Sequence, residues 1–187
     1  VHRGGRFMKL SVKALVLCAM AVVINVALGE TVSALKIPLL FLDTMGTIFI
    51  AAVYGMPYGI LTGIATNLLM GVVGGSWAAV PFALVSIAVA IVVALVARGN
   101  FTLPKAIIAG VLLSIVAPMI GAPIRIALFG GLTGSGTDVI ILALKQAGQE
   151  MISATYWGAV ASNIVDKMVS CILVAILLMN KQIKSML

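Results

Sequence analysis

Three polar side chains, Asn163, Asp166 and Lys167, stand within a long apolar run near the end of the chain. If this run is helical, their spacing of three and four residues puts them on one face. Ten residues with a rise of 1.5 Å each separate Asp166 from Tyr156, so its carboxylate is expected about 15 Å deep in a membrane. Polar groups at that depth are costly and usually functional. The pattern indicates either the polar floor of a small-molecule site or an internal Asp–Lys ion pair that stabilises the protein.

The motifs of several enzyme classes are missing from the sequence. There is no GxxxxGK[ST] and no Gly-Lys pair, which excludes ATP hydrolysis by a P-loop. No GxSxG nucleophile motif occurs, and the single histidine is His2. The residues needed for a serine-hydrolase site or a histidine–metal site are therefore missing. Cys18 and Cys171 lie far apart and are interpreted as packing residues. We therefore expect no enzymatic activity, no metal and no cofactor.

The composition is that of a membrane protein. Apolar residues make up 63% of the 187 residues and charged residues only 9%, against about 25% in soluble domains. So few charges cannot cover a water-facing surface, which excludes a soluble domain. The net charge of +7 comes from basic residues in tails and short loops, without an RNA-binding motif between them. These residues therefore favour a lipid bilayer as the partner, and no nucleic acid.

Six apolar segments predict an all-α integral membrane protein, a compact bundle of six transmembrane helices. The expected ranges are 11–29, 40–54, 58–73, 77–97, 104–128 and 153–179. The segments 40–54 and 58–73 are short, because about 16 residues give about 24 Å against a hydrocarbon core of about 30 Å. They either span with little tilt or form a re-entrant hairpin. Residues 1–7 precede a Met8 that resembles a natural start, so we treat them as an extension and 8–187 as one domain.

The distribution of Lys and Arg sets the expected orientation. With six spans, one side of the membrane carries Arg3, Arg6, Lys9, Lys13, Arg98, Lys105, Lys181 and Lys184. The other side carries only Lys36, Arg125 and Lys145. Basic loops are retained in the cytoplasm. Both termini are therefore expected to be cytoplasmic, in a multi-pass protein of the bacterial cytoplasmic membrane.

In this orientation, several polar and aromatic side chains fall in the outer half of the membrane: Asp43, Arg125, Trp77 and Trp157. Together with Asn67 and Asn163 they are expected to line one cavity open to the outside. The tryptophans have an alternative role as an interfacial belt, which is common at membrane surfaces. The Gly-rich stretch 130–138 and the segment 30–42 are outer connections, and we expect them to become more ordered when a ligand binds.

Glycines recur at four-residue spacing in and beside the segment 58–73: Gly55, Gly59, Gly63, Gly71 and Gly75. Small residues let membrane helices approach closely, because lipid provides no hydrophobic drive for helix association. The spacing therefore predicts a packing face. Clearance for a ligand near Gly71 and Gly75 is the alternative.

Three segments of the chain resemble one family of membrane proteins. They are Phe41-Leu42-Asp43-Thr44-Met45-Gly46-Thr47, Gly55-Met56-Pro57-Tyr58-Gly59-Ile60-Leu61-Thr62-Gly63 and Asn163-Ile164-Val165-Asp166-Lys167. These segments are similar to the substrate-binding S components of energy-coupling factor (ECF) vitamin transporters. The resemblance implies a protein that captures a micronutrient from outside and delivers it when docked to a transmembrane coupling protein and two ATPases. The energy source then lies on other chains, which explains the missing P-loop.

The resemblance also implies a docking face. The family docks through an Ala-x-x-x-Ala pattern on its first helix, and the nearest match is Ala14-x-x-x-Cys18, with Ala21 one turn further on. This departure keeps a surface of small residues but replaces one alanine by cysteine.

The resemblance favours high-affinity binding of pyridoxine or hydroxymethylpyrimidine, while riboflavin, thiamine and queuosine precursors stay open. Within the site, Asn163 and Lys167 are expected to face the ligand, and Asp166 either to hold Lys167 or to touch the ligand. The alternative from another class is an autonomous secondary transporter coupled to H⁺ or Na⁺ through Asp166. The short chain without an evident inverted repeat argues against it.

Overall fold

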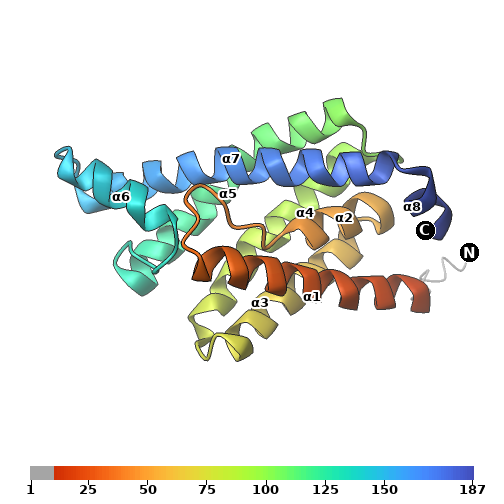
Figure 1. Ribbon diagram of the computed structural model, residues 1–187, viewed down its shortest axis with the longest axis horizontal. Helices are drawn as coiled ribbons and strands as arrows, with labels where there is room; N and C mark the ends of the chain where they lie inside the picture. The colour runs from red at the N-terminus through yellow and green to blue at the C-terminus, as the bar shows by residue number, and fades with distance from the viewer. Residues whose placement is uncertain (1–10) are drawn as a thin grey trace, which may run out of the picture.

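The computed structural model describes residues 11–187, and every regular element in that range is helical. The elements in chain order are α1 (Val12–Ala34), α2 (Met45–Tyr54), α3 (Met56–Val73), the short 3-10 helix η1 (Trp77–Phe82), α4 (Ala83–Ala97), α5 (Leu103–Phe129), α6 (Thr137–Gln146), α7 (Met151–Met179) and α8 (Lys181–Met186). They form one bundle, in which α5 and α7 pack along each other (Figure 1). The proposed extension 1–7 and the residues His2, Arg3, Arg6 and Lys9 lie outside the described range.

Within residues 11–187, five helical stretches are long and apolar enough to cross a membrane: α1, α3, η1 with α4, α5 and α7. The sixth expected span, 40–54, is different, because α2 has only 10 residues. At 1.5 Å per residue it covers about 15 Å, half of a hydrocarbon core. Leu39 and Leu42 have φ of 66° and 54°, so residues 35–44 form an irregular connection.

Small residues bring α1, α2, α3 and α4 close together. A Cβ added at Gly46 of α2 would lie 2.5 Å from the Ala21 backbone oxygen of α1. In α3, a Cβ at Gly59 would collide with α2, and one at Gly63 would lie 2.8 Å from the Ser86 Cβ of α4. Larger residues would hold these helices apart. The predicted packing face is confirmed at Gly59 and Gly63.

The small residues of α1 that the resemblance assigned to docking face into the bundle. Ala14 is 0% exposed, and Cys18 and Ala21 are each 4% exposed. Cys18 and Ala21 pack with Ile50 of α2. Their burial does not fit an exposed docking surface, because a partner cannot reach side chains that neighbouring helices already cover. The small residues instead allow α2 and α3 to approach α1.

A buried amide joins the first three helices. Asn25 of α1 donates through Nδ2 to the hydroxyls of Thr47 in α2 and Thr66 in α3, each at 3.0 Å. Its Oδ1 accepts from the backbone N–H of Gly46 at 2.6 Å. Every polar group of this fully buried side chain has a partner, so Asn25 stabilises the packing and is not free to bind a ligand.

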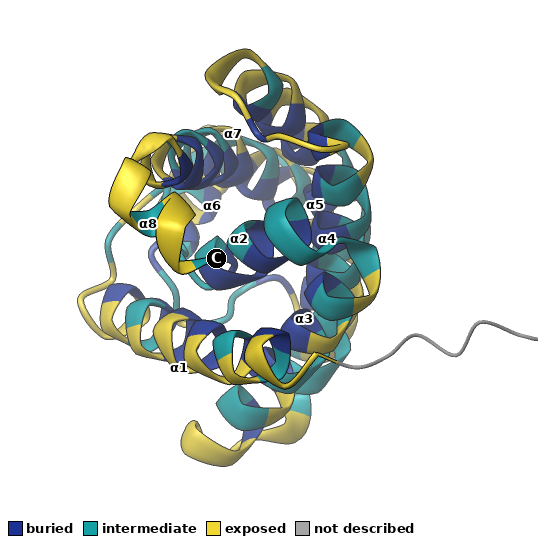
Figure 2. Ribbon diagram, turned by 90° about the vertical axis from the view of Figure 1, so that its right-hand side faces the viewer, coloured by how far each residue is buried: buried dark blue, intermediate teal, exposed yellow. Residues whose placement is uncertain are grey.

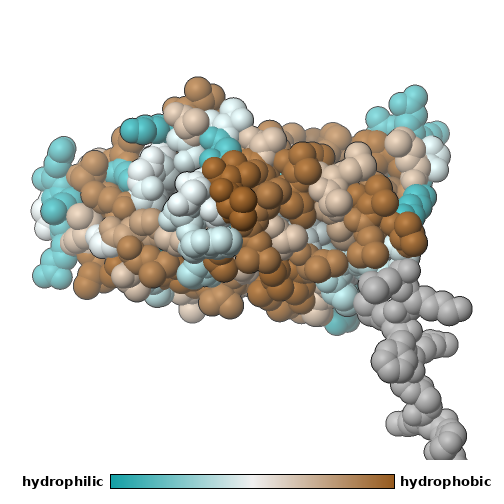
Figure 3. Space-filling view, turned by 90° about the horizontal axis from the view of Figure 1, so that it is seen from below, coloured by the Kyte–Doolittle hydropathy of each residue, from teal (hydrophilic) through white to brown (hydrophobic). Residues whose placement is uncertain are grey.

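The start of α1 and the C-terminus lie at one end of the bundle, and α6 lies at the other (Figure 1). Lys13 Nζ donates to the Leu187 backbone oxygen at 2.8 Å, which joins the two ends of the described chain. Viewed from that end, buried residues face the interior around α2 and exposed residues lie on the outside (Figure 2). The face seen in Figure 3 is mainly hydrophobic; hydrophilic residues lie at its two ends, and a paler, more polar patch lies between them. This surface is typical of a helical bundle that is embedded in lipid.

Candidate functional site

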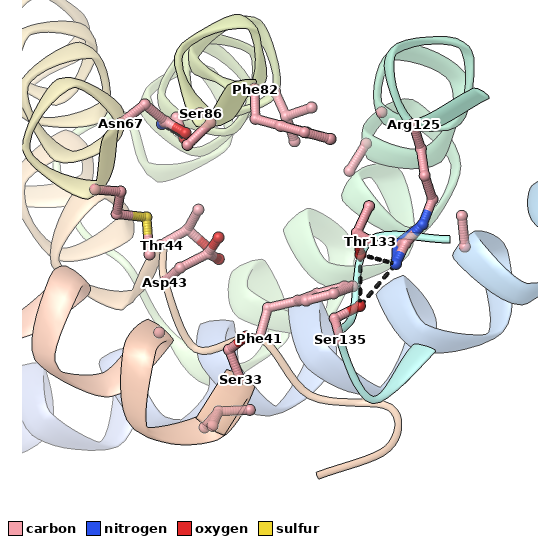
Figure 4. Close-up of a pocket in the computed structure, with 18 of the residues that line it drawn as sticks. Ser33, Phe41, Asp43, Thr44, Asn67, Phe82, Ser86, Arg125, Thr133 and Ser135 are labelled. Carbon is pink, nitrogen blue, oxygen red and sulfur yellow. Dashed lines mark hydrogen bonds between the residues drawn. The ribbon is translucent and has the colours of Figure 1, made fainter. Parts of the chain in front are cut away.

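A cavity of about 330 Å³ lies in the half of the bundle away from the chain ends. Its walls come from the last turns of α1 and α3, from η1 and the start of α4, and from the facing parts of α5 and α7. The connections 35–44 and 130–136 complete it (Figure 4). The polar lining residues are Glu30, Ser33, Asp43, Thr44, Asn67, Ser76, Ser86, Arg125, Thr133, Ser135, Asn163 and Lys167. The volume is at the lower end of the range for small-molecule pockets, about 300–1,000 Å³.

The structure brings together most of the residues expected at the site. Those that line the cavity are Asp43, Asn67, Arg125, Asn163 and Lys167. Trp77 and Trp157 do not line it, and they are 67% and 57% exposed on the outside of the bundle. Their positions match the alternative role, that of aromatic side chains at a membrane surface.

Asp166 lies behind the cavity wall and is 0% exposed. Its Oδ1 accepts hydrogen bonds from the backbone N–H groups of Phe41 and Leu42, at 2.8 and 2.9 Å. Its Oδ2 accepts from Lys167 Nζ at 2.7 Å. The carboxylate thus has three donors and fixes the 35–44 connection to the middle of α7. In this structure Asp166 anchors the residues that enter the cavity and does not itself face it.

Lys167 reaches the cavity although its side chain is 2% exposed. Besides the bond to Asp166, its Nζ donates to Thr44 Oγ1 at 3.0 Å. The ammonium also lies 5.9 Å from the centre of the Phe41 ring, within cation–π range. An ammonium has three N–H donors, so one donor is left for a ligand.

Asp43 follows the two anchored residues, and its carboxylate points into the cavity (Figure 4). Gly29 of α1 makes room for it, because a Cβ there would lie 2.9 Å from the Asp43 Cβ. Among residues 11–187 the carboxylate makes no hydrogen bond to another residue and no salt bridge. Polar groups enclosed in a protein normally have partners, so this carboxylate is available to a ligand.

Arg125 organises the wall formed by the Gly-rich connection. Its Nε donates to the Gly131 backbone oxygen at 3.0 Å, and its Nη2 donates to the hydroxyls of Thr133 and Ser135 (Figure 4). The same Nη2 forms a salt bridge with Asp138 at 3.0 Å. One buried guanidinium therefore folds the 130–138 stretch against the end of α5.

The connections 35–44 and 130–136 touch each other beside the cavity. A Cβ added at Gly136 would collide with the backbone oxygen of Ile37 and lie 2.9 Å from the backbone nitrogen of Pro38. Only glycine fits this contact without moving one of the chains. Both segments were expected to be outer connections. In the structure they contact each other directly.

Asn67 and Asn163 present oxygen atoms that have no donor. Asn67 Nδ2 donates to the Gly63 backbone oxygen and to Ser86 Oγ, at 3.0 and 2.8 Å, and Asn163 Nδ2 donates to the Ala159 backbone oxygen at 2.8 Å. A carbonyl oxygen can only accept, so the amide nitrogens must face these carbonyls and the Oδ1 atoms must point elsewhere. Within the described chain neither Oδ1 accepts a hydrogen bond.

Sequence reasoning missed several lining residues. Phe41 and Thr44 belong to the segment that carries Asp43, so their proximity to the site could have been inferred from adjacency. Thr133 and Ser135 lie in the Gly-rich stretch between two residues of opposite charge, Arg125 and Asp138, and this pairing was the available signal. Glu30 begins the segment 30–42, which was expected to become more ordered with a ligand, whereas nothing in the sequence pointed to Phe82 and Ser86, because their positions depend on which helices pack around the cavity.

The arrangement can enclose a small molecule between polar groups and apolar walls. No group of three or more His, Cys, Asp or Glu side chains able to hold a metal ion occurs in residues 11–187. Comparison of the chain with protein-family models, with curated proteins and with solved structures finds no match.

Proposed function

We propose that this chain is a substrate-binding membrane subunit of the ECF S-component type. It captures a small water-soluble vitamin or precursor from outside the cell, with pyridoxine or hydroxymethylpyrimidine favoured. Delivery then depends on a transmembrane coupling protein and two ATPase subunits. The observation that carries this proposal is the cavity with polar walls in the half of the bundle away from the chain ends.

The route of the chain supports six crossings with the second one interrupted. Residues 35–44 enter the bundle from the end where α6 lies, and α2 continues towards the end with the termini (Figure 1). Irregular backbone is tolerated at membrane depth only where protein or a cavity surrounds it. Here the Asp166 carboxylate satisfies two of the backbone N–H groups of this stretch. Interrupted membrane helices often form the binding sites of transport proteins.

The positions of the basic residues support cytoplasmic termini. Lys13, Arg98, Lys105, Lys181 and Lys184 belong to the chain ends and to the α4–α5 connection, at the end of the bundle where the termini lie. The opposite end carries Lys36 and Lys145, besides Arg125, which is paired with Asp138. By the positive-inside rule the cavity then opens towards the outside.

The bonding of Asp166 weighs against an autonomous ion-coupled transporter. A coupling carboxylate must exchange a proton or a sodium ion during transport. Asp166 instead accepts from two backbone N–H groups and from Lys167, and it does not line the cavity. Protonating it would break a buried ion pair, which is costly.

Uptake by proteoliposomes tests the proposal. The chain alone should bind labelled pyridoxine or hydroxymethylpyrimidine without concentrating it. Co-reconstitution with an ECF coupling protein and its two ATPases should produce accumulation that requires internal ATP and is insensitive to ionophores. Accumulation by the chain alone that disappears when an ion gradient is collapsed would favour the secondary transporter instead.

A further inference from the structure

Some of the ionisable side chains on the cavity wall have no salt-bridge partner. Each basic side chain there already has an acidic partner: Lys167 with Asp166 at 2.7 Å, and Arg125 with Asp138 at 3.0 Å. The two acidic side chains that line the cavity, Asp43 and Glu30, form no salt bridge with any residue in the range 11–187. With these two pairs formed, the wall keeps two carboxyl groups that have no salt-bridge partner.

Two uncharged side chains of the cavity wall also present hydrogen-bond acceptors. Asn67 and Asn163 are 5% and 8% exposed, both line the cavity, and each presents an Oδ1 without a donor while its Nδ2 is engaged. An amide oxygen can only accept hydrogen bonds. The Asp43 carboxylate and the Oδ1 atoms of Asn67 and Asn163 are therefore complementary to a ligand that brings N–H donors.

The two sides of the cavity also differ in the polar groups that they present. Asp43 and Asn67 lie on one side of the space, and Arg125, Thr133 and Ser135 lie on the other (Figure 4). Phe41 and Phe82 contribute to the wall between these sides, which suits the apolar face of a ring. Nη1 of Arg125 makes no hydrogen bond within the described chain, so the far side offers a donor for an oxygen of the ligand.

We propose that the cavity selects a small ring that carries a protonated aminoalkyl substituent, and that the Asp43 carboxylate receives this ammonium group. The inference rests on the proposed function and deepens it: among small-ring ligands related to pyridoxine, the form with an aminoalkyl substituent binds most tightly. The charge on the ligand pairs with the Asp43 carboxylate, and its N–H groups donate to acceptors of the cavity wall. Oxygen substituents on the ring face Arg125.

Three compounds that share the same ring test how the charge of one substituent affects binding. Pyridoxamine, pyridoxine and 4-pyridoxic acid differ at one position, which carries an aminomethyl, a hydroxymethyl or a carboxylate group. Their affinities are measured by titration calorimetry on the full chain in nanodiscs at neutral pH. A hydrogen bond to a charged group corresponds to about a 10- to 100-fold change in affinity. Pyridoxamine should therefore bind at least about tenfold more tightly than pyridoxine, and 4-pyridoxic acid should bind most weakly.

The variant Asp43→Asn tests whether the preference for pyridoxamine comes from this side chain. This nearly isosteric change should weaken pyridoxamine about 10- to 100-fold and pyridoxine less than about threefold. Glu150→Gln is the matched control, because it removes an exposed carboxylate that does not line the cavity, and its affinities should equal those of the wild type. An unchanged pyridoxamine affinity in Asp43→Asn overturns the assignment to Asp43. If that variant does not fold, the ranking on the wild-type chain decides.

The proposed function and the charge preference fail in different ways. If pyridoxine or 4-pyridoxic acid binds as tightly as pyridoxamine, the vitamin proposal survives and the preference for an aminoalkyl substituent is wrong. If none of the three binds, the pyridoxine-type substrate is wrong, and benzylamine, benzyl alcohol and benzoate are compared at millimolar concentration. Benzylamine must then bind best and lose that advantage in Asp43→Asn. Any other ranking, or no binding of benzylamine, overturns the preference for an aminoalkyl substituent as well.

Discussion

The buried pair Asp166–Lys167 gives a quantitative prediction about stability. Asp166→Asn leaves the Lys167 ammonium without its 2.7 Å counter-ion, and Lys167→Met leaves the carboxylate uncompensated. Removing one partner of a buried ion pair typically costs about 3–5 kcal/mol. Replacing both partners together is often close to neutral. In the double variant the amide oxygen introduced at position 166 can still accept from the N–H groups of Phe41 and Leu42, which the Asp166 carboxylate serves in the wild type.

We therefore expect each single variant to lose about 3–5 kcal/mol and the double variant Asp166→Asn with Lys167→Met to lose less than about 2 kcal/mol. At about 2–4 °C per kcal/mol for a chain of this size, the single variants should unfold about 6–20 °C lower than the wild type. Thermal unfolding in detergent, followed by tryptophan fluorescence, measures the difference. The exposed residues Lys145 and Glu150 provide the matched controls Lys145→Met and Glu150→Gln, which should unfold within about 2 °C of the wild type.

A double-mutant cycle decides whether this reasoning is correct. Strong coupling of about 3 kcal/mol or more means that the loss comes from an unpaired charge. If the losses of the two single variants simply add in the double variant, the two charges are independent and the argument is refuted. Ligand affinity in the double variant separates the roles further, because Lys167 lines the cavity and Asp166 does not. Wild-type affinity would make the pair purely structural.

Three further changes test other parts of the structure. Asn163→Ala should weaken binding of a pyridoxine-ring ligand about two- to tenfold by removing one hydrogen bond, measured by calorimetry, whereas Trp157→Phe, on the outer surface, should have no effect. Gly46→Val should lower stability in thermal unfolding by about 1–3 kcal/mol or more, because its Cβ would lie 2.5 Å from a backbone oxygen of α1. Gly136→Val should separate the connections 35–44 and 130–136 and speed proteolysis near Ile37, and an unchanged cleavage rate would mean that this contact does not restrain them.

The residues of α7 illustrate what could be predicted from sequence. The period of the α-helix alone places Asn163 and Lys167 on one face, and their place in the apolar run predicts that they lie deep in the membrane. Both side chains line the cavity as expected. The long apolar runs likewise predict five of the six expected spans, because a membrane-crossing helix satisfies its own backbone and needs no distant partner.

The features of the fold and the site that the sequence could not predict depend on contacts between distant segments. Asp166 binds the backbone of Phe41 and Leu42, 125 and 124 residues away in sequence, and no local pattern reports such a partner. The same holds for Ala14, whose small side chain suits either a docking face or a helix–helix contact until the position of its neighbours is known. The 40–54 segment is apolar throughout most of its length, yet its first residues leave the helix to meet α7 and the cavity. Apolar runs and helical periodicity follow from the sequence by local physics, whereas the choice of which polar groups pair and which stay open to a ligand depends on how the helices pack.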